Sequence, residues 1–192
     1  MESIADFLFE VGMLSKTPRS GYQFLGSGRE SVAEHILRTV FIGYALCKLN
    51  PSLNELDVLK MCVLHDLPEA RTGDMNYVNK KYVEVNEAKA VKELTEGLPF
   101  GDDIRRAIDE FNARETPEAN TARDADQIAL ILQLKEYGDL GNKYSDEWIH
   151  YALQRLATEE GKKLAERIIQ TDSSHWWFKD KSDWWINGCK RG

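Results

Sequence analysis

Apolar residues recur every three or four positions through most of this chain, and this spacing restricts its fold more than any other feature. Such spacing gathers apolar side chains on one face of an α-helix. The first such set is formed by Ile4, Phe7, Leu8, Val11 and Leu14. Further helices are predicted at 31–49, 54–66, 82–96, 102–111, 118–137, 145–156 and 164–169. No segment alternates with the period of two that is typical of strands, so the sequence predicts an all-α protein.

Length and composition narrow the class of protein further. A chain of 192 residues with 42% hydrophobic content can bury one full core, so we expect a single domain over residues 1–170. The net charge of -7 argues against binding of nucleic-acid polymers. No apolar run approaches the roughly 20 residues that cross a membrane. Three cysteines without close pairing are typical of a reducing compartment, and we expect a cytoplasmic protein.

The dipeptide His65-Asp66 is the first candidate for chemistry. It provides an imidazole nitrogen and a carboxylate oxygen, a mixed ligand set that suits a divalent ion. It follows a largely apolar helix, at whose inner end an unpaired carboxylate would be costly. Pro68 is expected to interrupt the helix and to bring Glu69 beside the pair. Taken alone, the dipeptide is more often a capping or salt-bridged pair.

The segment before the helix at 31–49 contains a second candidate. Residues 16–30 are rich in glycine, proline and basic residues, and on composition alone we interpret them as a solvated connection. Ser31 and Glu34 match a capping box, which places His35 in the first turn of the helix. A lone histidine there is more often a core or capping residue than a ligand.

Two aspartates enter the helix at 118–137. Asp124 and Asp126 are two residues apart, which is about 200° around a helix axis. The two carboxylates therefore cannot serve one compact site equally. One of them is predicted to be ordinary surface, and spacing alone does not choose between them.

The order of several short motifs along the chain indicates a protein family. They are Pro18–Gly21, Glu30–His35, His65-Asp66 with Glu69, Gly73-Asp74, and Arg123–Gln127 leading into Ile131–Gln133 and Glu136-Tyr137. Together they resemble the HD-domain metal phosphohydrolases, and within them the 5'-deoxynucleotidase branch. The resemblance covers roughly residues 1–140. It implies an HD-domain helical bundle that forms a homodimer.

The resemblance also implies a role for individual residues. The metal ligands would be His35, His65, Asp66 and Asp126. Glu69 would orient or deprotonate the attacking water beside Asp66. Arg19 would hold the phosphate, and Asp74 would border the sugar. Ser20 departs from the relatives that have tryptophan after this arginine, so we expect a softer preference for deoxyribose.

One divalent ion, Mn, Co, Fe, Zn or Mg, is implied as the cofactor, since His150 and His175 lie in the wrong segments for a second. The predicted activity is hydrolysis of (deoxy)nucleoside 5'-monophosphates, with little discrimination among bases. An HD hydrolase of another nucleotide, a triphosphate or an alarmone, would need more cations than Arg19 and Lys16 provide. A non-catalytic, metal-stabilised nucleotide-binding module remains as an alternative, although it would not need Glu69.

The C-terminal segment differs in composition from the rest. Residues 171–192 contain four of the five tryptophans in the chain, among charged residues. We expect this aromatic tail to pack on the body of the protein or on a partner subunit.

Overall fold

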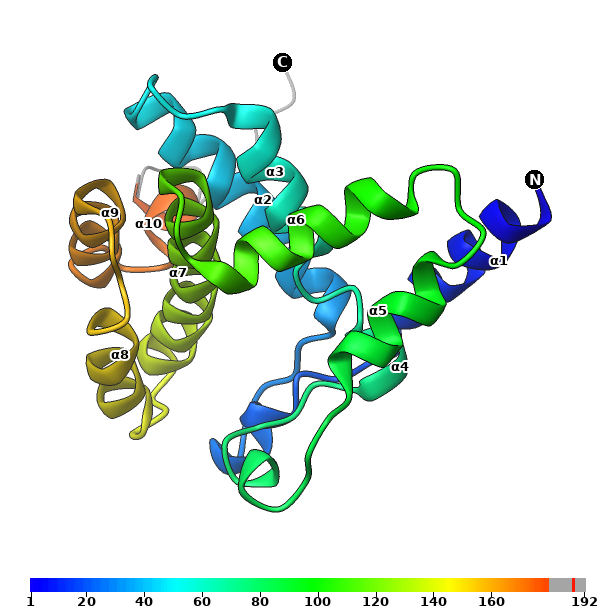
Figure 1. Cartoon of the computed structure of the whole chain (residues 1–192). Coiled ribbons are helices and arrows are strands. Elements are labelled where there is room, and N and C mark those ends of the chain that lie inside the picture. The colour runs from blue at the N-terminus through cyan, green and yellow to red at the C-terminus, as the bar shows by residue number, and fades with distance from the viewer. Residues whose placement is uncertain (180–187, 189–192) are drawn as a thin grey trace.

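The computed structural model describes residues 1–179 and 188, and all secondary-structure elements in this part of the chain are helices (Figure 1). The α-helices are α1 (Glu2–Val11), α2 (Val32–Leu49), α3 (Glu55–Leu64), α4 (Glu69–Thr72), α5 (Glu87–Thr95), α6 (Gly101–Ala113), α7 (Pro117–Asp139), α8 (Ser145–Leu153), α9 (Glu159–Ile169) and α10 (His175–Phe178). Short 3-10 helices are η1 (Gly12–Ser15), η2 (Ser20–Phe24) and η3 (Asn79–Lys81). The predicted all-α class is confirmed. None of these helices is long and apolar enough to cross a bilayer.

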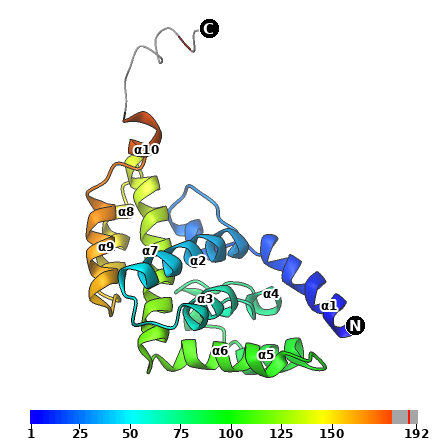
Figure 2. The same cartoon turned by 90° about the horizontal axis from the view of Figure 1, so that it is seen from above.

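Helix α7 is the centre of the main core. It packs against α2, α3, α6, α8 and α9 (Figures 1 and 2). Its inward positions include small, fully buried side chains such as Ala122 and Ala125, which let neighbouring helices approach closely. At the contact between α2 and α3, a Cβ atom on Gly43 would lie only 2.7 Å from Cys62 Sγ. A larger residue at position 43 would therefore force Cys62 or the two helices to shift.

A second, smaller apolar cluster holds the N-terminal side of the molecule. It combines Leu14 with residues of α5 and α6, and it includes Val32 at the start of α2 and Leu67 just after α3. The first turn of α2 and the end of α3 therefore lie where the two clusters meet. Candidate residues His35 and His65 are carried by these two segments and are both buried.

Two predicted segments need correction or completion. The helix expected over 82–96 begins only at Glu87, because the side chain of Asn86 accepts a hydrogen bond from Lys89 N at 2.9 Å and caps it. In the tail, the side chains of Trp176 and Trp177 are 87% and 50% exposed. Trp184 and Trp185 lie outside the described residues, so the packing of the tail stays a prediction.

Candidate metal centre and its pocket

The end of α3 presents His65 with a defined orientation. The helix stops at Leu64, before the predicted interruption at Pro68, and tight turns carry the chain to Glu69 at the start of α4. The Nδ1 atom of His65 lies 3.0 Å from the carbonyl oxygen of Cys62, so Nδ1–H donates to it. The Nε2 atom, on the other side of the ring, is buried and has no hydrogen-bond partner.

Three other side chains meet the His65 ring. His35 comes from the first turn of α2, where the predicted capping box of Ser31 is present. Its Nε2 atom lies 2.9 Å from Asp126 Oδ1 on α7, and ligand atoms of His35, His65 and Asp126 all lie within 4.8 Å of one another. Asp66 Oδ2 lies 3.3 Å from His65 Nε2 and 3.7 Å from His35 Nε2. We call these four residues the metal cluster.

The charges within the metal cluster stabilise one another. Burial raises the pKa of Asp66, but the neighbouring His65 outweighs it and lowers the value to about 2. The pKa of Asp126 is also lowered, because its hydrogen bond and charge interaction with His35 exceed the effect of burial. Burial lowers the pKa of His65, yet the charges of Asp66 and Asp126 raise it to about 9. A divalent cation would supply the positive charge that these carboxylates favour, and the unpartnered His65 Nε2 fits a metal ligand.

Beside the cluster lie a partly buried cation and a partly buried carboxyl group. Arg19 Nη1 is 3.4 Å from Asp66 Oδ2, and the charges of Asp66 and Asp126 raise the pKa of Arg19 despite its burial. Burial and then the charges of Asp66 and Asp74 raise the pKa of Glu69 to about 9. The Oε2 atom of Glu69 is buried without a hydrogen-bond partner. Both side chains line a pocket that Asp66 and Asp126 of the metal cluster also line.

The interpretation of residues 16–30 as a solvated connection holds for only part of the segment. Tyr22 and Leu25 are only 5% and 4% exposed, and the Tyr22 hydroxyl donates to Glu30 Oε2 at 2.9 Å. The backbone N–H of Arg19 donates to the carbonyl of Glu30 at 2.8 Å. This segment is therefore folded against the body of the protein, and the buried Glu30 holds it in place.

Ser20 joins the Arg19 segment to the loop that contains Asp74. Its backbone N–H donates to Asp74 Oδ2 at 2.6 Å, and its hydroxyl donates to the Asp74 carbonyl oxygen at 2.8 Å. The hydroxyl also accepts from the backbone N–H of Asn76 at 3.0 Å. Ser20 thus fixes the carboxylate that we expect to border the sugar.

Asp124 lies on the opposite side of α7 from the metal cluster, but it is not surface. It is 1% exposed, and its carboxylate accepts hydrogen bonds from Ala157 N and Thr158 N at 2.8 Å and from the Thr158 hydroxyl. The prediction that one of the two aspartates is ordinary surface is therefore wrong. Asp124 fixes the connection between α8 and α9, while Asp126 joins the histidines.

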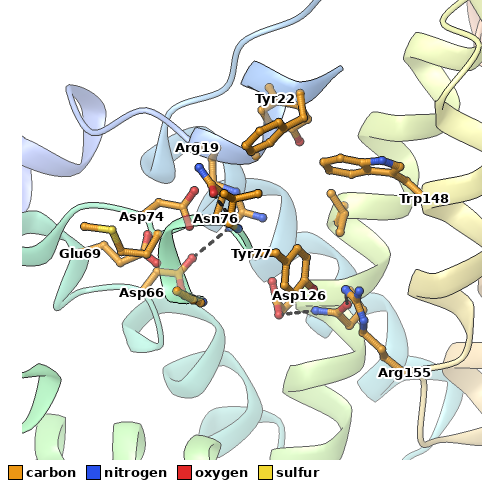
Figure 3. Close-up of a pocket in the computed structure, with 17 residues that line it drawn as sticks. Arg19, Tyr22, Asp66, Glu69, Asp74, Asn76, Tyr77, Asp126, Trp148 and Arg155 are labelled. Carbon is orange, nitrogen blue, oxygen red and sulfur yellow. Dashed lines mark hydrogen bonds and ion pairs between the residues drawn. The ribbon is translucent and has the colours of Figure 1, made fainter. Parts of the chain in front are cut away.

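The metal cluster opens into a cavity of about 320 Å³, near the lower end of the range for small-molecule sites (Figure 3). Arg19, Asp66, Glu69 and Asp74 line one part, which we call the charged end. Tyr77, Trp148 and Arg155 line the other part, which we call the aromatic end. The sequence did not point to the aromatic end, because these residues share no motif and meet only in the folded chain.

Comparison with known proteins gives the class of this site. A model of the HD domain matches residues 11–169, which include the whole metal cluster. A conserved hypothetical protein from Pyrococcus furiosus superposes with a TM-score of 0.75 at 27% identity, covering 87% of this chain and 99% of that one. A structure from Magnetospirillum magnetotacticum, described as a predicted metal-dependent phosphohydrolase, shares the fold with a TM-score of 0.70 at 22% identity, over 88% of this chain and 90% of that one. The chain belongs to the HD-domain family.

Sequence relatives indicate the branch of the family. The 5'-deoxynucleotidase HDDC2 of Homo sapiens is 30% identical over 149 residues, which cover 73% of this chain and 71% of that protein. The 5'-deoxynucleotidase hdd1 of Schizosaccharomyces pombe is 32% identical over 145 residues, covering 70% and 72%. The resemblance read from the motifs, to the 5'-deoxynucleotidase branch, is confirmed.

Proposed function

We propose that the protein is a metal-dependent hydrolase that releases phosphate from 2'-deoxynucleoside 5'-monophosphates. The observation that carries this proposal is the metal cluster, with Arg19 and Glu69 beside it in one cavity. A cation-binding set, a phosphate-binding arginine and a carboxylate base are the components that phosphomonoester hydrolysis needs. The relatives named 5'-deoxynucleotidases support the substrate class.

His35, His65, Asp66 and Asp126 would hold one divalent ion, with Mn, Co, Fe, Zn and Mg as the candidates. Two nitrogen and two oxygen ligands suit these metals. Such an ion lowers the pKa of a bound water and neutralises charge that develops on the phosphate. We propose a single ion because His150 is exposed and hydrogen-bonded to Gln154, away from the cavity.

Three side chains outside the cluster would act on the substrate. Arg19 binds the non-bridging phosphate oxygens, for which the planar guanidinium offers paired donors. Glu69 orients and deprotonates the attacking water, and a cation in the cluster would offset the negative neighbours that hold its proton. Asp74, fixed by Ser20, accepts a hydrogen bond from the sugar.

The charges near the cluster favour monophosphates over longer phosphate chains. Arg19 is the cation closest to the cluster, whereas Glu69 and Asp74 would face any further phosphate groups. Lys80 and Arg155 line the same cavity, but Asp74 and Glu69 lie beside Arg19, so additional phosphate groups there would face negative charge, which is costly. We propose that deoxyribose is favoured over ribose, with a softer exclusion than in relatives that have tryptophan in place of Ser20.

We also propose that the protein is a cytoplasmic homodimer. Leu37, Phe41 and Tyr44 of α2 are 61%, 68% and 47% exposed and lie on one face of the helix. An apolar face of this kind is typical of a subunit interface. Sedimentation would test whether two copies of the chain associate through this face, and Phe41→Glu should yield monomers.

The function is tested by measuring phosphate release from matched deoxy- and ribonucleoside mono- and triphosphates, adding each metal separately after chelation. Deoxynucleoside monophosphates should give the highest kcat/KM. Arg19→Ala should abolish most activity, while Arg29→Ala, in the same loop but outside the cavity, should not. Faster turnover of triphosphates would contradict the substrate assignment. Tight metal binding without turnover of any nucleotide would instead favour a non-catalytic module.

A further inference from the structure

The aromatic end of the cavity has no role in the chemistry at the metal cluster. Its side chains come from separate segments: Tyr77 follows α4, Trp148 belongs to α8, and Arg155 lies just after α8. The Trp148 ring passes 3.8 Å from the position of a Cβ atom on Gly21. It therefore packs beside the segment that carries Arg19, so a ligand with its phosphate at Arg19 would extend toward this ring (Figure 3).

The guanidinium group of Arg155 is held in place by two neighbours. Its Nη1 atom donates to Gln127 Oε1 at 3.2 Å, and its central carbon lies 5.0 Å from the centre of the Tyr77 ring. Gln127 is fixed in turn, because its Nε2 atom donates to Asp126 Oδ2 at 2.8 Å. In the described part of the chain, no carboxylate forms an ion pair with Arg155. Its remaining N–H groups are therefore available to a ligand in the cavity.

We propose that Trp148 and Tyr77 stack on the nucleobase, that Arg155 donates hydrogen bonds to its edge, and that guanine is consequently preferred to adenine. This inference rests on the proposed function and specifies its substrate. Guanine presents two neighbouring acceptors, O6 and N7, which match the fork of an arginine. Adenine places an amino group where guanine has O6, so donor would face donor. The preference differs from the weak base discrimination expected from sequence, which did not point to Arg155.

The first test compares dGMP, dAMP and 2-deoxyribose 5-phosphate, which lacks a base. The kcat/KM value for dGMP should exceed that for dAMP by about tenfold, the usual effect of a paired arginine contact. Arg155→Met should remove this advantage and change the value for the base-free sugar by less than about twofold. Arg167→Met, an exposed arginine of α9 outside the cavity, is the matched control. Equal values for dGMP and dAMP in the parent protein would overturn the guanine preference.

The second test removes the stacking surface. Trp148→Leu should lower kcat/KM for both nucleotides by about tenfold and leave the base-free sugar phosphate unaffected. Tyr151→Leu, on the same helix but 54% exposed and outside the cavity, should affect none of the three. Equal losses for all three substrates in Trp148→Leu would mean that the ring serves the structure only, and would overturn its stacking role.

A binding measurement separates this inference from the proposed function. Calorimetry with deoxyguanosine and deoxyadenosine requires no turnover, and deoxyguanosine should bind more tightly unless Arg155 is replaced. If no phosphomonoester is hydrolysed but this difference persists, the proposed function fails and the base site stands. If hydrolysis occurs but both nucleosides bind equally to the parent and to both variants, the base site fails and the function stands.

Discussion

The metal cluster and the aromatic end of the cavity are built in different ways. His35, His65 and Asp126 are carried by or directly adjoin long helices packed in the core, and both histidines are buried. Tyr77 is 61% exposed on an irregular segment, and Arg155 lies in the connection between α8 and α9. The first region is positioned by helix packing, and the second by individual hydrogen bonds and ring contacts. We therefore expect substitutions in the two regions to have effects of different size and on different properties.

The largest effect should follow loss of a ligand in the metal cluster. Asp126→Ala removes one of two carboxylates from a closely spaced set, so bound metal and turnover should both fall to background. Metal content after dialysis and phosphate release measure this. Asp124→Ala, on the other side of α7, should keep its metal per folded molecule. The opposite pattern would reverse our assignment of the two aspartates.

A smaller effect is expected when the base is lost but the cluster stays intact. Glu69→Gln preserves the shape of the side chain but cannot accept the proton, so kcat should fall by about 10² to 10⁴-fold. Metal content and substrate affinity should be unchanged. Glu96→Gln, an exposed glutamate at the end of α5, provides the control. Near-normal turnover in Glu69→Gln would exclude this residue from the mechanism.

Replacement of Asp124 tests how the connection between α8 and α9, which carries Arg155 of the aromatic end, is held in place. Replacing it by alanine leaves Ala157 N, Thr158 N and the Thr158 hydroxyl without their acceptor, which should lower the free energy of unfolding by about 2 to 3 kcal/mol. Urea denaturation measures the change. Asp146→Ala, at an exposed position on α8, should alter stability by less than about 0.5 kcal/mol. Equal stability of both variants would contradict the structural role of Asp124.

The smallest effect should come from Ser20. In Ser20→Ala, the Asp74 carboxylate still accepts a hydrogen bond from the backbone N–H of residue 20. The Asp74 carbonyl oxygen loses the hydroxyl donor of Ser20, a change worth about 1 kcal/mol. The kcat/KM value for a deoxynucleotide should drop about fivefold, while that for a phosphomonoester without a sugar stays constant. Gln23→Ala, exposed in the same loop, should match the parent for both substrates.

The sequence predicted those features that local rules determine. Caps at Ser31 and Asn54 and the apolar spacing located α2 and α3. The motifs pointed to His35, His65, Asp66 and Asp126, whose side chains meet in the folded chain. Local rules were insufficient where distant segments meet. Neither the hydrogen bond of Tyr22 to Glu30 nor the contacts of Asp124 with Thr158 leaves a periodic signal, because each joins side chains outside one helix face. The aromatic end was missed for the same reason.

The contact between Gly43 and Cys62 has a thermodynamic consequence for the metal cluster. His35, Thr39 and Gly43 follow one another at intervals of four on the same face of α2, so the glycine that sets the spacing from α3 also sets the separation of the two histidines. The ligand side chains therefore lose their conformational entropy when the chain folds, so metal binding does not have to order them. Cation binding should then raise the melting temperature steadily with metal concentration. Gly43→Ala should weaken that dependence by forcing α2 and α3 apart.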